Sequence, residues 1–269
     1  MVILNKFLRK GSSFEQAVKD IETLAEKILE FPNIESIFGK KWLESEIKKG
    51  FFPLLKYRIA PLEEAIHNLK QISGFDIWKK NILSNRKGFD SYEFEIIELN
   101  RLANLSDHII LYPTILKEDK KDPSFSEAKM KRGGIEFYVE MTKFFEISNP
   151  KNKIKKLIEK GRNQIPKNSC GFIFVDVGDV TLVEVKPFIN NSLNYSLNYD
   201  LKSNLEELVE IVDQFFKGEN TRILGILFIE PYLIQNENNL ITLEKRICLT
   251  SNKHNKLKLD SNELIKLIF

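Results

Sequence analysis

The sequence contains few of the residues from which common catalytic and metal sites are built. It has two cysteines, Cys170 and Cys248, whose spacing argues against a zinc site or a disulfide framework. Its three histidines are scattered without ligand spacing, which argues against histidine metal sites and histidine-based triads. Gly-rich phosphate loops of the Walker and dinucleotide-binding types are also missing, so ATP and NAD chemistry have no visible place.

Long apolar runs are missing as well. The longest, Ile223–Ile229, is far shorter than a membrane span, and residues 1–4 are too few for the core of a signal peptide. We therefore expect a cytoplasmic protein that does not contact a membrane. The 42% of residues that are hydrophobic are enough for a full core, and the net charge of +3 is too small to indicate a partner by itself.

The first part of the chain is predicted to be all-helical. A capping-box signature at Ser12 precedes apolar residues at helical spacing, and this helix should end near Pro32. The polar segment 84–88 marks a boundary between an N-terminal helical lobe, 1–88, and a second domain, 89–269. Further helices are expected in the lobe at Lys40–Lys49, Pro61–Ile72 and Asp76–Leu83.

The second domain alternates helices and strands, which predicts an α/β fold with a mixed central sheet. Helices are expected at 90–105, from 149 to about 166, at 203–216 and at 262–269. Strands are expected at 108–116, 125–131, 135–142, 171–175, 222–230 and 241–249.

The centre of this domain is predicted to be a β-hairpin. A turn signal at 132–134 separates two strand-like arms, which should pair antiparallel. We expect Met130 to lie opposite Glu136, and counting outward from that pair places Ser126 opposite Glu140. The start of one arm then meets the end of the other, a geometry in which carboxylates can hold Mg²⁺ beside an attacking water.

Two short motifs in the hairpin carry a family resemblance. Pro-Ser-Phe at 123–125, followed by Tyr-Val-Glu-Met-Thr at 138–142, resembles the Pro-Asp-Phe and Val-Glu-x-Lys pair of the PD-(D/E)XK nuclease superfamily. The resemblance covers roughly 89–230 and implies a restriction-endonuclease-like αβββαβ core. Ser124 stands where the superfamily has a metal-binding Asp, and Thr142 stands where it has a Lys.

The resemblance also implies a metal-dependent site. Glu140 would be the central ligand of Mg²⁺ or Mn²⁺, and Asp122 would take the place of the missing aspartate. Glu98, on the first core helix, would be a further ligand, although Glu95 is one turn back and nearly as well placed.

The missing lysine has two substitutes that stay open. Lys143 is adjacent to Thr142 but should point to the opposite face unless the strand ends or bulges there. Lys155 or Lys156, on the next helix, would instead reach the site, because the cation is needed only in space near the scissile phosphate.

That next helix begins the densest basic segment of the chain. Between 151 and 167 seven positive charges face the single Glu159, a pattern that would attract a phosphate backbone and is equally typical of a solvated helix face. Gln164 lies where some members of the superfamily place a glutamine toward the site. The candidate nucleic-acid-binding residues are Lys151, Lys153, Lys155, Lys156, Lys160, Arg162 and Gln164.

A literal Glu-x-Lys motif also occurs outside the hairpin, at Glu184 and Lys186, with Asp176 and Asp179 before it. A two-residue turn at 178–179 would leave Asp176 several residues from Glu184 along the ladder. We therefore place the candidate site at the hairpin.

Three functions follow from these patterns. The first is a metal-dependent nuclease that hydrolyses phosphodiester bonds of DNA or RNA. The second is a catalytically inactive module of the same fold that binds nucleic acid or protein, because losing a charged ligand and a cation together is typical of such descendants. The third is a structural or regulatory protein that acts through a protein partner of its N-terminal lobe.

Overall fold

A computed structural model of the chain describes residues 31–49, 59–84, 89–115, 124–144, 146, 148–178, 205–216, 221–235 and 241–269. Within these ranges the protein is a mixed α/β structure with eight helices, a six-stranded mixed sheet and a separate two-stranded sheet. No helix in these ranges is long and apolar enough to cross a membrane. The helix predicted after Ser12 lies outside them.

The described N-terminal part is helical, as predicted. Its helices are α3 (Pro32–Phe38), α4 (Lys40–Lys49), α6 (Ala60–Leu69) and α7 (Phe75–Ser84). Pro32 begins α3, whereas the sequence predicted a helix end there; proline suits a first turn because its missing N–H needs no partner. Buried residues of these helices share one hydrophobic core with the sheet, and the predicted boundary at 85–88 lies outside the described residues.

Six strands form the larger sheet: β1 (His108–Leu111), β4 (Ala128–Arg132), β5 (Ile135–Lys143), β6 (Gly171–Asp176), β7 (Ile223–Gln235) and β8 (Ile241–Ser251). Their order across the sheet is β1-β4-β5-β6-β7-β8. The central strands β5, β6 and β7 run parallel, and the outer pairings are antiparallel. The predicted strand at 108–116 is interrupted at Tyr112, whose φ is 46°, and its second half forms the small sheet of β2 (Thr114–Ile115) and β3 (Ser124–Phe125). The helices of this part of the chain are α8 (Phe89–Leu105), α9 (Pro150–Gln164), α11 (Leu205–Phe215) and α12 (Ser261–Ile268).

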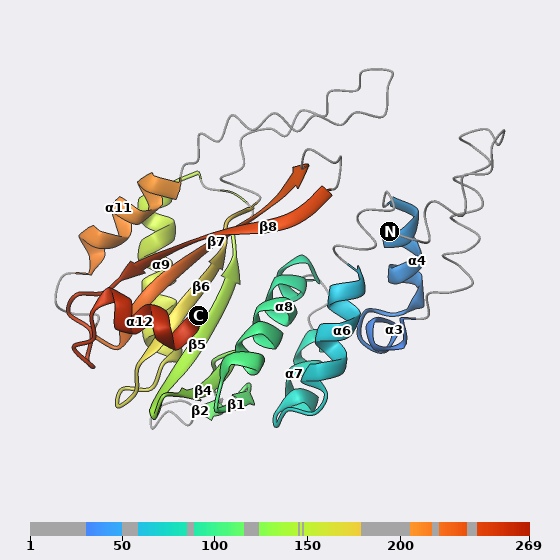
Figure 1. The fold of residues 1–269 in the computed structure, drawn as a ribbon, viewed down its shortest axis with the longest axis horizontal. Helices are drawn as coiled ribbons and strands as arrows, with labels where there is room; N and C mark the ends of the chain where they lie inside the picture. The colour runs from blue at the N-terminus through green and yellow to red at the C-terminus, as the bar shows by residue number, and fades with distance from the viewer. Residues whose placement is uncertain are drawn as a thin grey trace, which may run out of the picture.

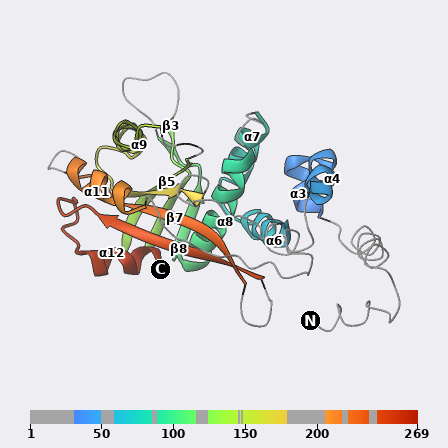
Figure 2. The same cartoon turned by 90° about the horizontal axis from the view of Figure 1, so that it is seen from above.

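Helices cover both faces of the sheet (Figures 1 and 2). Helices α9 and α11 lie on one face, and α8 and α12 lie on the other. Strand β6 is buried throughout: Phe172 and Phe174 pack on the α8 side, and Ile173 and Val175 pack on the α9 side. A strand buried on both faces has a continuous apolar sequence, which is why this one was readily predicted.

A two-residue turn joins β4 to β5. Gly133 and Gly134 have φ values of 57° and 81°, and Arg132 pairs with Ile135 across the turn. Two successive positive φ values favour glycine and match the twist of a tight hairpin. The turn therefore uses two residues, where the sequence analysis had assigned three.

This turn changes the pairing of the two hairpin arms. Met130 lies opposite Phe137, so the predicted pairing of Met130 with Glu136 is wrong by one residue. Because one residue of slip exchanges the partners along the whole ladder, Glu127, and not the serine before it, lies across from Glu140. The corrected register brings a second carboxylate to the position where a serine was expected.

Candidate active site

Two buried carboxyl groups meet where the hairpin arms end. The side chain of Glu140 in β5 is fully buried and Glu127, just before β4, is nearly so. Glu127 Oε2 accepts a hydrogen bond from the backbone N–H of Met141 at 2.8 Å, which holds Glu127 beside Glu140. Burial raises the pKa of both groups, and the charge of Glu127 raises the pKa of Glu140 further.

A lysine from α9 completes this pair. Lys160 Nζ lies 2.5 Å from Glu140 Oε1. Burial alone would lower the pKa of Lys160, but the charges of Glu140 and Glu127 outweigh burial and raise it, so the ammonium form is retained. Helix α9 comes close to the sheet at Gly161, where a Cβ atom would lie 2.4 Å from the side chain of Ile173.

A third carboxyl group, Glu95 of α8, lies next to Glu127. Its Oε1 accepts hydrogen bonds from Trp78 Nε1 at 2.7 Å and from the Tyr112 hydroxyl at 3.0 Å. Burial, followed by the charge of Glu127, raises the pKa of Glu95 to about 8. The site thus contains three buried carboxyl groups from three different segments, and the charge of Glu127 raises the pKa of both of the others.

The charges of this cluster do not balance when its acids are ionised. Three carboxylates and one ammonium leave two negative charges in a buried place. The Glu140 carboxyl group contacts Lys160, and it forms a hydrogen bond with the side chain of Glu127 when one of the two acids is protonated. Uncompensated buried charge is strongly unfavourable, so the cluster requires either protons or a cation.

The donor chemistry fits a hard divalent cation. Carboxylate oxygens are the protein ligands that Mg²⁺ prefers, and it usually takes one or two of them together with waters and substrate phosphates. Glu127 and Glu140 are such a pair. No group of three or more His, Cys, Asp or Glu side chains within the described ranges is already arranged to hold a metal ion. The fit to a divalent cation therefore rests on Glu127 and Glu140, with Glu95 close to Glu127.

Glu98 does not take part in this cluster. Its Oε1 lies 2.6 Å from Lys245 Nζ and its Oε2 lies 2.7 Å from Arg101 Nε. These two cations outweigh the effect of burial and lower the pKa of Glu98. Because cations contact both oxygens, the structure gives no support to the metal role that the resemblance implied for Glu98.

The other residues of the predicted motif do not join the carboxyl cluster in the described part of the chain. Asp122 and the side chain of Ser124 lie outside the described part of the chain. Thr142 is half-buried and, two residues after Glu140, lies on the same face of β5. Lys143 faces the opposite side, with its Nζ 3.6 Å from Asp176 Oδ2, because the pairing of β5 with β6 is regular through this point.

The basic helix α9 lies directly beside the carboxylates. Lys160, which was predicted only to bind nucleic acid, contacts Glu140. The backbone carbonyl of Gln164 accepts a hydrogen bond from Ser126 Oγ at 3.2 Å, which ties the segment carrying Glu127 to the end of α9. Of the other predicted residues, Lys151, Lys155 and Lys156 are exposed, Lys153 lies over the ring of Phe144, and Arg162 is half-buried.

The alternative motif contributes no second cluster to the described structure. Asp176 pairs with Lys143, while Asp179, Glu184 and Lys186 lie outside the described residues. The two cysteines are free thiols, Cys170 buried and Cys248 half-buried.

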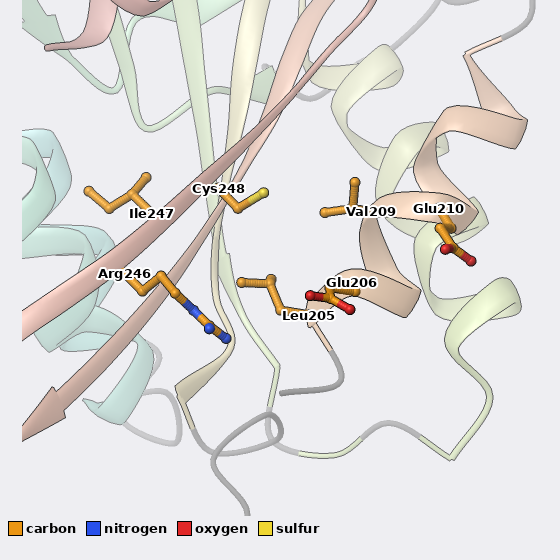
Figure 3. Close-up of a pocket in the computed structure, with 7 residues that line it drawn as sticks. All are labelled: Leu205, Glu206, Val209, Glu210, Arg246, Ile247 and Cys248. Carbon is orange, nitrogen blue, oxygen red and sulfur yellow. The ribbon is translucent and has the colours of Figure 1, made fainter. Parts of the chain in front are cut away.

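A groove of about 500 Å³ lies elsewhere, between α11 and β8 (Figure 3). Arg246, on its wall, forms an ion pair with the buried Glu230 at 2.8 Å. The groove contains none of the predicted site residues. Its lining residues are Leu205, Glu206, Val209, Glu210, Arg246, Ile247 and Cys248.

Sequence reasoning missed Glu127 entirely and gave Lys160 a different role. The Gly-Gly pair in the sequence could have indicated Glu127, because a two-residue turn at these glycines places Glu127 across from Glu140. Comparisons of the chain with protein-family models, with curated proteins and with solved structures gave no match.

Proposed function

We propose that the protein is a metal-dependent nuclease that hydrolyses phosphodiester bonds of DNA or RNA. One observation carries this proposal: the buried Glu127–Glu140 carboxyl pair, joined by an ammonium from the neighbouring helix. In support of it, the elements α8, β1, β4, β5, α9 and β6 follow one another in the order αβββαβ once the small β2–β3 sheet is set aside, as in a restriction-endonuclease-like core.

Each residue of the cluster has a defined role in this proposal. Glu127 and Glu140 would hold Mg²⁺ or Mn²⁺, and Glu95 would supply a flanking carboxylate. A bound divalent ion would supply charge stabilisation and a more acidic water. The chain itself orients both carboxylates, since the Met141 N–H binds Glu127 and Lys160 contacts Glu140.

Lys160 takes the place of the missing motif lysine. The motif position holds Thr142, which carries no charge, and Lys143 is directed away and paired with Asp176. Lys160 Nζ is the cation found at the Glu140 carboxylate. An ammonium at this place would stabilise negative charge on a phosphate that enters the cluster.

The exposed lysines of α9 provide a path for the nucleic-acid backbone. Lys156 precedes Lys160 by four residues, so both lie on one side of the helix, and Lys155 is adjacent and exposed. A phosphate chain that follows α9 would reach the carboxylates at Lys160. This arrangement does not distinguish DNA from RNA, because it reads only the backbone.

The test is cleavage of end-labelled DNA and RNA, single-stranded and duplex, by the full chain with Mg²⁺ or Mn²⁺. We expect Glu127→Gln and Glu140→Gln to reduce the rate by at least about 100-fold. Glu136→Gln is the matched control, because Glu136 is an exposed glutamate of β5 that pairs with Lys129 at 3.1 Å. Binding without cleavage under any metal would instead favour the inactive binding module.

A lysine exchange tests the role of Lys160 directly. Lys160→Ala should abolish most cleavage. Thr142→Lys in the same chain should restore part of it, because Thr142 lies on the strand face of Glu140. If both proteins fold and the double variant cleaves no faster than Lys160→Ala, the proposal that Lys160 replaces the motif lysine is contradicted.

A further inference from the structure

Two neutral side chains hold Glu95 in a single orientation. Trp78 Nε1 and the Tyr112 hydroxyl both donate to Glu95 Oε1, at 2.7 and 3.0 Å. All three side chains are buried. Two donors on one oxygen fix the carboxyl plane, and neither donor carries a charge that would neutralise Glu95 when it is ionised.

Glu95 and Glu98 differ in whether a cation neutralises the buried carboxylate. Both glutamates are buried on α8, one turn apart, but Glu98 is neutralised by Lys245 and Arg101. Glu95 forms no ion pair within the described residues. A buried carboxylate with a purely structural role is most stable when cations neutralise it, as they do Glu98. A buried carboxylate that neutral donors orient, as they do Glu95, can instead bind a cation that enters the site.

Tyr112 also connects Glu95 to Glu127. Its backbone N–H donates to the Glu127 carbonyl oxygen at 2.9 Å, and its hydroxyl, which also has Asn81 of α7 as a partner, donates to Glu95. Its φ of 46° is unfavourable for a non-glycine residue and persists only where surrounding contacts impose it. One residue thus binds the carboxyl group of Glu95 through its hydroxyl and the backbone of Glu127 through its N–H.

The N-terminal helices are fixed to the same point. The carbonyl of Ser73 accepts a hydrogen bond from the Leu111 N–H at 2.8 Å, immediately before Tyr112. At Gly74 a Cβ atom would lie 1.9 Å from the Leu111 carbonyl oxygen, so only glycine permits this approach. Helix α7, which carries Trp78, therefore packs against the strand end that carries Tyr112.

We propose that Trp78 and Tyr112 are positioning residues that aim Glu95 at the Glu127–Glu140 pair, so that the N-terminal helical part belongs to the metal site. This inference rests on the proposed function. It assigns to α7 a role in metal affinity, which a separate helical lobe would not have. Tyr112 and Trp78 act through Glu95 and are not expected to touch the substrate.

The test is Mn²⁺ binding to the full chain, measured by titration calorimetry without nucleic acid. Tyr112→Phe keeps the ring and removes the hydroxyl, and we expect it to weaken Mn²⁺ binding by about 10- to 100-fold, as is usual for residues that orient metal ligands. Trp78→Phe should act in the same direction and serves as the second variant if Tyr112→Phe does not fold. Trp42→Phe, the other tryptophan, stacked on Phe38, is the matched control and should bind as the wild type does.

A double variant separates positioning from general packing. If Tyr112 acts through Glu95, Tyr112→Phe should weaken Mn²⁺ binding no further in a Glu95→Gln background. The inference would be overturned if Tyr112→Phe weakened Mn²⁺ binding equally in the wild-type and Glu95→Gln backgrounds. It would also be overturned if Tyr112→Phe and Trp78→Phe both bound Mn²⁺ with wild-type affinity. Either result would leave the nuclease proposal intact. A wild-type chain that neither binds Mn²⁺ nor cleaves nucleic acid would overturn the proposed function itself.

Discussion

Glu127 is fixed by the residue that follows its partner carboxylate, since its Oε2 accepts a hydrogen bond from the backbone N–H of Met141 at 2.8 Å. This contact crosses from the start of β4 to β5. It keeps the Glu127 carboxylate beside Glu140 despite their mutual repulsion. Two like charges held together in this way are unfavourable for the protein alone and useful for holding a cation.

The first prediction is that Glu127→Gln raises the stability of the metal-free protein. In EDTA at about pH 9, above the pKa of about 8 of Glu95, removing one of three buried carboxylates should relieve repulsion, and we expect a gain of about 1 kcal/mol in unfolding free energy. The same variant should lose most of the stabilisation that Mn²⁺ gives the wild type. Thermal unfolding in EDTA and in Mn²⁺ measures both effects. A variant that is less stable in EDTA would contradict the repulsion argument.

Much of the fold could be predicted from the sequence, for identifiable physical reasons. The strand at Gly171–Asp176 and the helix at Phe89–Leu105 have strong apolar patterns and were correctly predicted to within a few residues. The site was harder, because a single residue of register decides whether Ser126 or Glu127 meets Glu140. A turn of two glycines and one of three residues both fit the sequence, and only tertiary packing distinguishes them.

The choice between Glu95 and Glu98 shows a second limit. Both lie on the same helix with similar neighbours in sequence. Their difference comes from Lys245, which is 147 residues away in sequence from Glu98, and from Trp78 on another helix. Likewise Lys160 reaches Glu140 from a different element. Partners that are distant in sequence have no local pattern, so a sequence alone does not reveal them.

The second prediction is that Glu98→Gln destabilises the protein without weakening Mn²⁺ binding. Glu98 joins Lys245 to Arg101, and Arg101 Nη1 also donates to the Ile268 carbonyl at 2.7 Å, which secures α12. Because both cations are partly exposed, we expect a loss of about 1–3 kcal/mol, below that of a fully buried pair. Urea unfolding measures it. Weaker Mn²⁺ binding in this variant would indicate that Glu98 is a metal ligand after all.

The third prediction concerns the pH dependence of that loss. The pKa of Glu98 is lowered in the folded protein from its ordinary value of 4.5, so its contribution is fully present above that value. It is lost as the pH falls through the folded pKa, because protonation then removes the charge that Lys245 and Arg101 bind. The difference in unfolding free energy between wild type and Glu98→Gln should therefore shrink on acidification below about 4.5. A difference that stayed constant from pH 7 to pH 3 would show that charge is not its cause.

The fourth prediction compares two glycines with the same φ. Gly39 and Gly74 have φ values of 88° and 90°, but a Cβ atom at Gly39 meets nothing within 4 Å, whereas at Gly74 it would overlap the Leu111 carbonyl. Alanine at either position should cost about 1–3 kcal/mol of backbone strain. Gly74→Ala should lose a further amount of about 1–3 kcal/mol from the overlap and should also weaken Mn²⁺ binding. Equal stabilities in urea would show that α7 does not press on the end of β1.

The fifth prediction tests the path along α9. Replacing Lys155 and Lys156 by alanine should lower the affinity for nucleic acid and reduce the slope of log K against log salt by about 1.4–1.8, for two phosphate contacts. The loss should be similar for different sequences, because backbone contacts carry no sequence information. Lys131→Ala is the control, since Lys131 is exposed on the hairpin, away from α9. Fluorescence anisotropy with E140Q as the parent chain measures binding without cleavage. An unchanged slope in the double variant, with binding intact, would mean that nucleic acid approaches the carboxylates by another route.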